Sequence, residues 1–553
     1  MKLNGSQIIL KVLKEKGVDT LFGYPGGAVI PFFDALYDEL DYFHVYRPAH
    51  EQNGVHAADG YARSTGKLGV FIATSGPGAT NAVTGIATAY MDSVPLLVIT
   101  GQVPNMLIGK DSFQEIDVTG ITLSVTKHNF IVRKIEDLQQ TIEKAIDIAF
   151  GGRPGPVVVD IPKDIFLGEY EYETKHYQAE QKESLIDEKA LEKAIELINS
   201  AQKPVIYAGG GVRLSKTDDL LVSFAEKASI PVANSFMGLG TIDRNHPLSL
   251  GFVGMHGFKE TNMAVTNCDL LIAIGARFSD RVIGNPNKFA PNAKIIHIDI
   301  DGTEVDKNTT NCIPLLGDFH TILSKLIQLA ETDKKEVRTK WLFSIHETAV
   351  PKGDLTTFTP ENIIEKVNHC YQENTIVVTD VGQHQMWAGQ YWKFKKSNEF
   401  ITSGGLGTMG FGMGAAFGAQ TGNPDKNTVL ITGDGCFRMS SQEMVTLSKY
   451  KVPIRIVMFN NHTLGMVRQW QKMFSNKRYC ETDIGEDVDY IALSEAYHIK
   501  AYRVENLNEL EAVLEETKHL REPLFFECVI DKDCNVFPIV PPGRPIDELL
   551  LND

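Results

Sequence analysis

The sequence has few cysteines for its length and no long apolar run. Its seven cysteines are scattered through 553 residues without a CxxC pair, which suits a reducing compartment better than a disulfide framework and suggests no metal-thiolate site. No apolar run reaches the roughly 20 residues that span a bilayer, and the first residues lack the features of a signal or transit peptide. We therefore expect a cytoplasmic protein without a membrane partner.

Positive charge is also scarce. The chain has 54 Lys and Arg against 70 Asp and Glu, so its net charge is 54 − 70 = −16. No run or stripe of basic residues that could follow a phosphate backbone is visible, so we expect no nucleic-acid partner.

The length of the chain indicates several domains. At 553 residues it is too long for a single core, and a typical domain size of roughly 100–200 residues gives three or four domains.

Short apolar runs alternate with helix-like stretches along nearly the whole chain. Runs such as "LGVFIAT", "DLLIAIGA" and "NTVLITGDG" are rich in Val, Ile and Leu and close on Gly, Asp or Thr. Such runs are typical of parallel strands that are buried on both faces. The pattern predicts an α/β fold with parallel sheets flanked by helices.

Two polar stretches without this pattern divide the chain. We predict three domains at 1–166, 187–345 and 359–553, with linkers at 167–186 and 346–358. The apolar runs of the first and third domains follow each other in a similar way, which indicates two variants of one architecture.

Two of the apolar runs end in oxygen-bearing side chains. Asp434 lies in a Gly-Asp-Gly turn and Asn461 in an Asn-Asn pair 27 residues later, which leaves room for one strand-helix-strand unit. In an open parallel sheet, ligands bind beyond the carboxyl ends of the strands. One carboxylate, one amide oxygen and a backbone carbonyl, for which Thr463 is the candidate, suit Mg²⁺ that also binds phosphate oxygens. Either motif alone is also an ordinary turn, but the spacing favours a magnesium diphosphate site.

This spaced pair resembles the binding motif for thiamine diphosphate (ThDP). Further motifs narrow the resemblance; in chain order they include "YPGGAVIPFFDAL", "HEQNGVHAADGYARSTG", "SGPGATNAVTGIATAYMDSVPLLVITGQV", "DSFQEIDVTGIT", "GARFSDRVIGN", "VGQHQMWAGQYW", "SGGLGTMGFG" and "LGMVRQWQ". The set is similar to the catalytic large subunit of the acetohydroxyacid synthases, over almost the whole chain. The resemblance implies the three-domain, pyruvate-oxidase-like architecture of ThDP enzymes.

For ThDP, the resemblance gives Glu51 the central role. A carboxylate bonded to N1′ of the aminopyrimidine favours the tautomer whose 4′-nitrogen removes the thiazolium C2 proton. Met409 and the Gly407 carbonyl correspond to groups that bend the cofactor. Taken alone, Glu51 would be a carboxylate stabilised by a helix dipole and Met409 a packing residue. The implied ThDP residues are Glu51, Val381, Gln383, His384, Gly407, Met409, Gly433, Asp434, Gly435, Cys436, Asn461 and Met466.

The middle of the chain carries a weaker nucleotide signal. "YAGGGV" at 207–212 follows a strand-like run but does not complete GxGxxG, so a tight packing turn is an equal alternative. The resemblance implies FAD here. Its role would be structural, because joining two ketoacids with loss of CO₂ transfers no electrons overall. The implied FAD residues are Arg153, Gly209, Gly210, Gly211, Met255, His256, Gly275, Arg277, Asp299 and Asp318.

Other residues are implied to act on the substrates. Arg281 corresponds to a residue that holds the carboxylate of the second ketoacid, as a guanidinium does bidentately, and Trp470 to one that contacts its extra methyl group. An interdomain salt bridge and a packed indole are the alternatives. Ser279 replaces the acidic residue common there, so nearby flavin contacts stay open. Gly27, Gln114 and Phe113 would lie near the reacting carbons, and Lys163 near the entrance.

The function implied is that of an acetohydroxyacid synthase dependent on ThDP, Mg²⁺ and FAD. It would make 2-acetolactate from two pyruvates, or 2-aceto-2-hydroxybutyrate from pyruvate and 2-ketobutyrate, for valine, leucine and isoleucine synthesis. The family places ThDP between subunits, which implies a homodimer, a dimer of dimers and a small regulatory subunit. The alternatives are a catabolic acetolactate synthase, a pyruvate oxidase and an inactive homologue kept as a scaffold.

Overall fold

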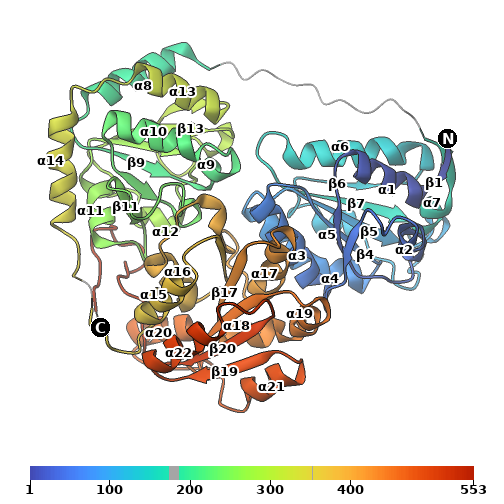
Figure 1. Cartoon of the computed structure of the whole chain (residues 1–553). Coiled ribbons are helices and arrows are strands. Elements are labelled where there is room, and N and C mark those ends of the chain that lie inside the picture. Colours follow the sequence, from blue (N-terminus) through green and yellow to red (C-terminus); the bar gives the residue numbers. More distant parts are fainter. Residues whose placement is uncertain (173–185, 352, 553) are drawn as a thin grey trace.

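The computed structural model describes residues 1–172, 186–351 and 353–552. Within them the chain forms three six-stranded sheets whose neighbouring strands run parallel, with helices packed around each sheet (Figure 1). The predicted α/β fold is confirmed. None of the helices in the described part of the chain has the length and apolar character needed to cross a membrane.

The N-terminal and C-terminal sheets share one strand order. In the N-terminal sheet the order is β3 (His44–Tyr46), β2 (Thr20–Gly23), β4 (Gly69–Ala73), β5 (Leu96–Gln102), β7 (Pro156–Pro162) and β6 (His128–Ile131). In the C-terminal sheet it is β16 (Phe400–Ile401), β15 (Thr375–Thr379), β17 (Asn427–Gly433), β18 (Ile454–Asn460), β20 (Leu524–Val529) and β19 (Lys500–Val504). When the strands of each sheet are numbered along the chain, both sheets have the order 2-1-3-4-6-5. The predicted kinship of these two domains is therefore visible in their topology.

The central sheet has a different order. It runs β11 (Ser249–Phe252), β10 (Val232–Asn234), β9 (Pro204–Ala208), β12 (Leu270–Ile274), β13 (Lys294–Asp299) and β14 (Ile313–Leu316). Counted within the domain, this is the 3-2-1-4-5-6 arrangement of doubly wound dinucleotide-binding folds. The strand order reverses between β9 and β12, and ligands bind at such a switch point.

Helices link the strands in all three domains. In the N-terminal domain they are α1 (Gly5–Glu15), α2 (Ile30–Tyr37), α3 (Glu51–Thr65), α4 (Pro77–Met91), α5 (Val118–Thr122), α6 (Leu138–Phe150) and α7 (Lys163–Leu167). In the central domain they are α8 (Glu188–Ser200), α9 (Gly210–Leu214), α10 (Asp218–Ala228), α11 (Lys259–Asn267), α12 (Asp280–Ile283), α13 (Phe319–Leu329) and α14 (Lys335–His346). In the C-terminal domain they are α15 (Pro360–Cys370), α16 (Gln383–Tyr391), α17 (Phe411–Gly422), α18 (Asp434–Ser440), α19 (Met444–Tyr450), α20 (Gly465–Phe474), α21 (Tyr490–Ala496) and α22 (Leu507–Thr517).

The predicted linker at 167–186 begins in regular structure. β8 (Glu169–Glu171) pairs antiparallel with β1 (Lys2–Asn4). The sequence did not reveal this strand because Glu-Tyr-Glu lacks the apolar run by which buried strands are found. Residues 173–185 of this linker lie outside the described residues. The exact domain boundaries stay predictions.

Helices α3 and α17 join the N-terminal domain to the C-terminal domain, and residues of both domains share one apolar core. A Cβ added to Gly60 would lie 2.0 Å from the carbonyl oxygen of Ala415, and one added to Gly418 would lie 1.7 Å from that of Ala57. The two backbones therefore approach more closely than any residue with a side chain allows. This contact holds the middle of α3 against the C-terminal domain, and Glu51 is the first residue of the same helix.

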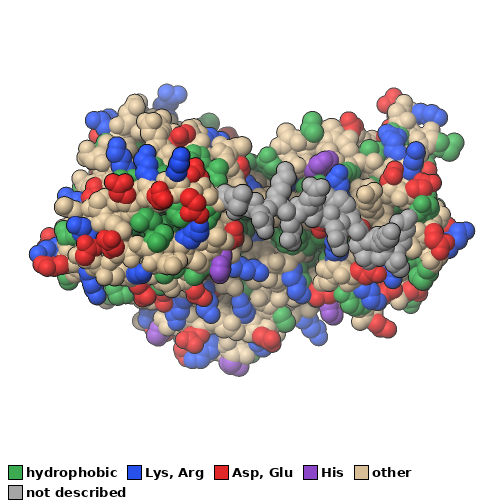
Figure 2. All heavy atoms as spheres, turned by 90° about the horizontal axis from the view of Figure 1, so that it is seen from above, with side chains coloured by type: hydrophobic (Ala, Val, Ile, Leu, Met, Phe, Trp, Pro, Cys, Tyr) green, Lys and Arg blue, Asp and Glu red, His purple; other side chains and the backbone are tan. Residues whose placement is uncertain are grey.

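The surface carries both kinds of charge. On the face shown in Figure 2, acidic and basic side chains are interspersed rather than gathered by sign. A mixed surface of this kind does not produce the one-signed field that steers a charged polymer onto a protein.

Candidate active site

A pocket lies at the carboxyl edge of the C-terminal sheet, where the neighbouring strands β15, β17 and β18 end. All ThDP residues implied by the resemblance line this pocket, except Glu51 and Gly407. The amino ends of α16, α18 and α20 begin at Gln383, Asp434 and Gly465, which also line it. Helix amino ends present free amide donors and a partial positive charge, so this edge is suited to an anion such as a diphosphate.

Asp434 is a carboxylate without its full set of partners. The side chain is buried; Oδ1 accepts a hydrogen bond from the amide of Gly435 at 3.0 Å, whereas Oδ2 has no partner among the described residues. Burial raises the pKa of Asp434 to about 7. A buried carboxylate oxygen without a partner costs stability, and a divalent cation would remove that cost. Asp434 therefore fits the predicted metal ligand.

Asn461 and Thr463 line the same pocket as Asp434, and some of their hydrogen-bonding groups already have partners within the protein. Asn461 donates from Nδ2 to Gln383 Oε1 at 3.3 Å, and Oδ1 accepts from the Thr463 amide at 3.3 Å. The Thr463 hydroxyl donates to the Thr482 carbonyl at 2.6 Å, so the main-chain carbonyl remains the candidate ligand. The described residues contain no cluster of three His, Cys, Asp or Glu side chains suited to a metal. A cation here would need ligand or water oxygens, as Mg²⁺ with a diphosphate has.

The turn that carries Met409 is fixed by Asp380, a residue for which no role was predicted from the sequence. Buried Asp380 accepts hydrogen bonds from the amides of Gly410 and Gly412 at 2.8 and 3.0 Å. Gly407 and Gly410 have φ of +71° and +88°, a region that favours glycine. Gly407 itself does not line the pocket, whereas Met409 does. Asp380 closes the apolar run "TIVVTD" as Asp434 closes its own run, and this signal could have identified it.

Two further pocket residues are uncharged. Burial lowers the pKa of His384 to about 3, so the imidazole is neutral at physiological pH, and Nε2 is buried without a hydrogen-bond partner in the described chain. Burial also raises the pKa of the Cys436 thiol, whose Sγ donates to the Val381 carbonyl at 2.9 Å. Nε2 of His384 is therefore available to a ligand, whereas the thiol is not a thiolate nucleophile.

Glu51 lies in a second cluster, on the N-terminal domain. It begins α3, and its Oε2 accepts from Asn81 Nδ2 on α4 at 3.0 Å. A Cβ added to Gly78, in the first turn of α4, would lie 3.5 Å from Glu51 Oε1. Gln114, whose φ is +61°, packs on Gly76, where an added Cβ would lie 2.9 Å from that of Gln114. Glu51 and Gln114 therefore both adjoin the start of α4.

Other predicted N-terminal residues lie around this cluster. The amide of Ala28, next to Gly27, donates to Thr74 Oγ1 at 3.2 Å, and a Cβ added to Gly78 would lie 2.8 Å from the Thr74 methyl. Phe113 is 88% exposed, which leaves its ring open to a partner. Lys163 begins α7 after β7, and no hydrogen bond or ion pair between described residues ties it to Glu51 or Gln114.

Arg281 and Trp470 come together although they belong to different domains. The guanidinium carbon of Arg281 lies 5.9 Å from the centre of the Trp470 ring, within the range of a cation–π contact. The Arg281 side chain is 62% exposed, and its closest carboxylate, Asp280, lies 3.7 Å away. Asp280 belongs to the same helix, so no interdomain salt bridge of Arg281 is seen among the described residues. The guanidinium is open to a carboxylate from solution.

The glycines of the central domain pack against one another. A Cβ added to Gly209 would lie 2.0 Å from the Gly275 carbonyl oxygen, and one added to Gly211 would lie 2.6 Å from the Gly275 Cα. Close backbone packing thus accounts for these three glycines by itself. Gly210 is less constrained, since its added Cβ would meet Met237 at 3.3 Å.

The remaining predicted FAD residues have varied surroundings, and two of them make contacts between the central and N-terminal domains. Arg153 pairs with Glu304 at 2.8 Å, and Arg277 donates to the Met91 carbonyl at 2.8 Å. Asp318 caps α13 by accepting from the Thr321 amide. Of the others, Met255 lies 3.7 Å from Arg281, His256 is buried with its pKa lowered by burial to about 4, and Asp299 ends β13.

Comparisons with known proteins agree with this geometry. Three family models match the chain: "Thiamine pyrophosphate enzyme, N-terminal TPP binding domain" at 3–121, the corresponding central domain at 191–326 and the C-terminal TPP binding domain at 380–528. Fold and pocket thus define a thiamine pyrophosphate (ThDP) enzyme, and its class is settled by these matches.

Curated relatives are more specific. The chain is 46% identical to the "Probable acetolactate synthase large subunit" of Methanocaldococcus jannaschii, over 99% of this chain and 95% of the relative. It is 43% identical to the acetolactate synthase large subunit of Lactococcus lactis, over 99% and 96%, and 42% identical to the acetolactate synthase isozyme 2 large subunit of Escherichia coli, over 99% and 99%. The chain belongs to the acetolactate synthase large-subunit family, that is, the acetohydroxyacid synthases.

Proposed function

We propose that this chain is the catalytic subunit of a biosynthetic acetohydroxyacid synthase of the cytoplasm. It decarboxylates pyruvate and transfers the two-carbon unit to a second 2-ketoacid. Pyruvate as acceptor gives 2-acetolactate and 2-ketobutyrate gives 2-aceto-2-hydroxybutyrate, both for branched-chain amino-acid synthesis. The observation that carries the proposal is Oδ2 of Asp434, which has no hydrogen-bond partner in the described part of the chain and is buried in a pocket at which three helices begin.

The pocket residues have distinct tasks in this proposal. Asp434, Asn461 and the carbonyl of Thr463 hold Mg²⁺, and the helix amino ends hold the diphosphate of ThDP. Bound ThDP supplies the carbon nucleophile that decarboxylation of a 2-ketoacid requires. Asp380 keeps Met409 at the wall of the pocket through the amides of Gly410 and Gly412.

Glu51 acts on the cofactor of a second copy. The pocket is lined by residues between Val381 and Val467, and Glu51 is not among them. Exposed apolar side chains next to residues of both half-sites support a partner that covers them; they are Phe113 beside Gln114, Leu406 beside Gly407, and Met439 on α18, which begins at Asp434. In the dimer, the Glu51 carboxylate holds a proton at N1′ of the pyrimidine. We propose a dimer of dimers as the assembled form.

The second ketoacid lies between the central and C-terminal domains. Arg281, open to solvent on one side, binds its carboxylate through two parallel hydrogen bonds. Trp470 lies beside that guanidinium and contacts the extra methyl of 2-ketobutyrate. Gln114, Gly27 and Phe113 approach the reacting carbons from the partner, and Lys163 lies toward the entrance.

FAD has a structural role at the switch point of the central sheet. The 3-2-1-4-5-6 strand order supports a dinucleotide there. Nε of buried Arg213, on the helix that follows the glycine turn, has no hydrogen-bond partner among the described residues, although Asp92 and Asp59 attract its charge. This N–H is therefore free to donate to an acceptor atom of the nucleotide. Gly210, Arg277 and Asp299 lie at or just after the carboxyl ends of β9, β12 and β13, respectively. The relatives are named as large subunits, which supports a second, smaller subunit as a regulatory partner.

One incubation tests the proposal. The purified chain is given ThDP, Mg²⁺, FAD and pyruvate without oxygen, and the products are identified. We expect CO₂ and acetolactate. Acetyl phosphate or peroxide, formed when phosphate and oxygen are admitted, would identify a pyruvate oxidase instead. Absence of CO₂ release would indicate an inactive homologue, and full turnover without flavin a catabolic synthase.

A further inference from the structure

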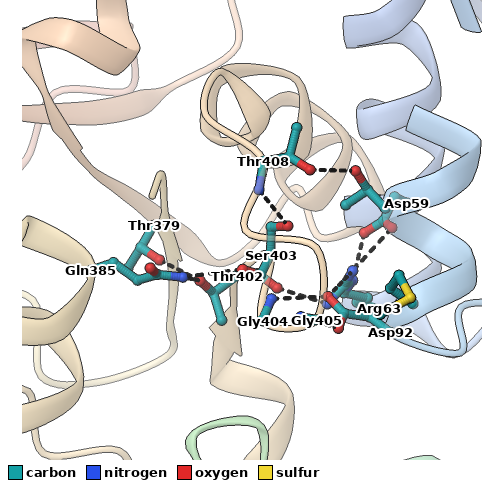
Figure 3. Close-up of polar contacts among 12 residues, drawn as sticks. Asp59, Arg63, Asp92, Thr379, Gln385, Thr402, Ser403, Gly404, Gly405 and Thr408 are labelled. Carbon is teal, nitrogen blue, oxygen red and sulfur yellow. Dashed lines mark hydrogen bonds and ion pairs between the residues drawn. The ribbon is translucent and has the colours of Figure 1, made fainter. Parts of the chain in front are cut away.

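A buried ion cluster joins the N-terminal domain to the turn before Met409 (Figure 3). Arg63 and Asp59 lie on α3, and Asp92 follows α4; their side chains are at most 1% exposed. Arg63 Nε contacts Asp59 Oδ1 at 2.5 Å, and Nη2 donates to Asp92 Oδ2 at 3.1 Å. The opposed carboxylates raise the pKa of Arg63 above its ordinary value, so the guanidinium is charged.

The cluster forms hydrogen bonds with the backbone of the C-terminal domain. Arg63 Nη1 donates to the Thr402 carbonyl at 2.8 Å, and the Asp92 carboxylate accepts from the amides of Gly404 and Gly405 at 3.0 and 2.7 Å. A Cβ added to Gly405 would lie 2.8 Å from Asp92 Oδ1. The carboxylate therefore reaches both amides only because glycine stands there.

Hydroxyl and amide groups hold the same segment from other sides. Within the C-terminal domain, Gln385 Nε2 donates to Thr402 Oγ1 at 2.7 Å, and the Thr408 amide donates to Ser403 Oγ at 3.0 Å. From the N-terminal domain, Thr88 Oγ1 lies 2.7 Å from Thr408 Oγ1. Segment 402–408 is thus fixed at its start and at its end, and the next residue is Met409, which lines the pocket.

Stability alone does not account for this cluster. Burying charges costs free energy that apolar packing avoids, and the close contact of Gly60 and Gly418 already holds α3 against α17. What ionic hydrogen bonds add is direction, because they fix a given amide or carbonyl at a given place.

We propose that Arg63 and Asp92 are positioning residues, which act through segment 402–408 to set Met409 in the cofactor pocket. The proposal rests on the proposed function, in which this pocket holds ThDP. Placement of the cofactor would then depend on the N-terminal domain of the same chain, in addition to Glu51 of the partner. A displacement of about 1 Å in a reacting group can cost ~10²-fold in rate, so small changes in this turn matter.

The test compares Arg63→Lys and Asp92→Asn with Arg338→Lys in the full-length, cofactor-loaded protein. Arg338 is a matched control, because it is 1% exposed and donates to the carbonyls of Ile198, Ala201 and Ala228, away from segment 402–408. We measure the thermal midpoint, ThDP affinity by titration, and kcat and KM for pyruvate. We expect the first two variants to lose about 10- to 10²-fold in kcat and to bind ThDP more weakly, with a smaller change in KM. Arg338→Lys should lower the thermal midpoint but keep kcat and ThDP affinity.

Other outcomes contradict the proposal. If both variants lose stability while the folded fraction keeps the parental kcat and ThDP affinity, the cluster is structural. If Arg338→Lys loses kcat as strongly, the effect is not specific to this turn. Should the charge variants not fold, Thr88→Val removes one neutral contact and must still lower kcat and raise amide hydrogen exchange at 404–410. A parent protein that forms no acetolactate would instead refute the proposed function.

Discussion

The guanidinium of Arg281 lies over the indole of Trp470, 5.9 Å from the ring centre. One residue comes from α12 of the central domain and the other from α20 of the C-terminal domain. A guanidinium and an aromatic ring thus lie side by side, an arrangement that suits the proposed recognition of a short 2-ketoacid. Their relative position depends on how the two domains pack.

Trp470→Leu should therefore change acceptor choice. One methylene in an apolar pocket is worth roughly 1–3 kcal/mol, or about 10–200-fold, so the preference for 2-ketobutyrate over pyruvate should fall by about an order of magnitude or more. Acetolactate formation from pyruvate alone should persist. A competition assay measures the ratio of the two products, and an unchanged ratio in an active variant would exclude Trp470 from this role.

Asp434 should make metal binding depend on pH. Since burial raises its pKa to about 7, the carboxyl of the metal-free protein takes up a proton as pH falls below 7, and affinity for Mg²⁺ and ThDP should fall with it. Titrations of Mg²⁺ at several pH values measure this. In Asp434→Asn, Mg²⁺ should bind weakly at every pH, and a variant that binds like the parent would refute the assignment.

The same pKa gives a stability prediction of opposite direction. The folded-state pKa lies above the ordinary 3.8, so the metal-free fold is favoured when Asp434 is protonated, and this contribution is lost as pH rises through about 7. The thermal midpoint of the metal-free parent should fall from pH 6 to 8 by more than that of Asp434→Asn. Asp160, whose pKa burial also raises to about 7, is present in both proteins and cancels. If the thermal midpoint changes equally with pH in the two metal-free proteins, Asp434 does not titrate between pH 6 and 8.

Mixing two inactive variants tests the shared active site. Glu51→Gln should slow C2 proton exchange by about 10²-fold, and Asp434→Asn should impair cofactor binding. If each site takes Glu51 and Asp434 from different copies, a hybrid dimer regains one intact site of two. Random reassociation of equal amounts then restores about a quarter of the parental activity. No recovery in hybrids confirmed by mass spectrometry would place both residues in one chain's site.

The flavin should be required but not reduced and reoxidised. Removal of FAD should abolish acetolactate formation, and a redox-inert analogue should restore much of it, because the proposed role is structural. Arg213→Met should weaken FAD binding, as measured by flavin fluorescence, if the buried Nε faces the cofactor. An analogue that binds without restoring activity would contradict the structural role.

The backbone contact between α3 and α17 predicts a stability effect. A methyl group in Gly418→Ala would lie 1.7 Å from the Ala57 carbonyl oxygen, and overpacking of this kind costs about 1–3 kcal/mol. Gly353→Ala is the control, since its added Cβ would meet Glu361 Oε2 at 3.8 Å. Thermal unfolding should separate the two variants clearly. Equal midpoints would mean that the helices shift apart without cost.

Local pattern was enough to determine the fold class and one half of the candidate site. Buried parallel strands consist of continuous apolar residues, so the runs that end at Asp434 and Asn461 could be read as strands with a site at their carboxyl ends. The expected neighbourhood follows from topology, because β17 and β18 are adjacent. Which cofactor lies there came from the resemblance, since oxygen ligands at strand ends do not specify thiamine.

Only the tertiary structure decided the rest. Asp380 holds the Met409 turn, Arg63 joins α3 to Thr402, and Arg281 meets Trp470 through contacts between segments far apart in the chain. Gly209 and Gly211 proved to pack on Gly275, an alternative that the motif could not separate from nucleotide binding. The physical reason is that propensity and periodicity act over a few residues, whereas burial, hydrogen-bond partners and unpartnered atoms depend on which distant segments the fold brings together.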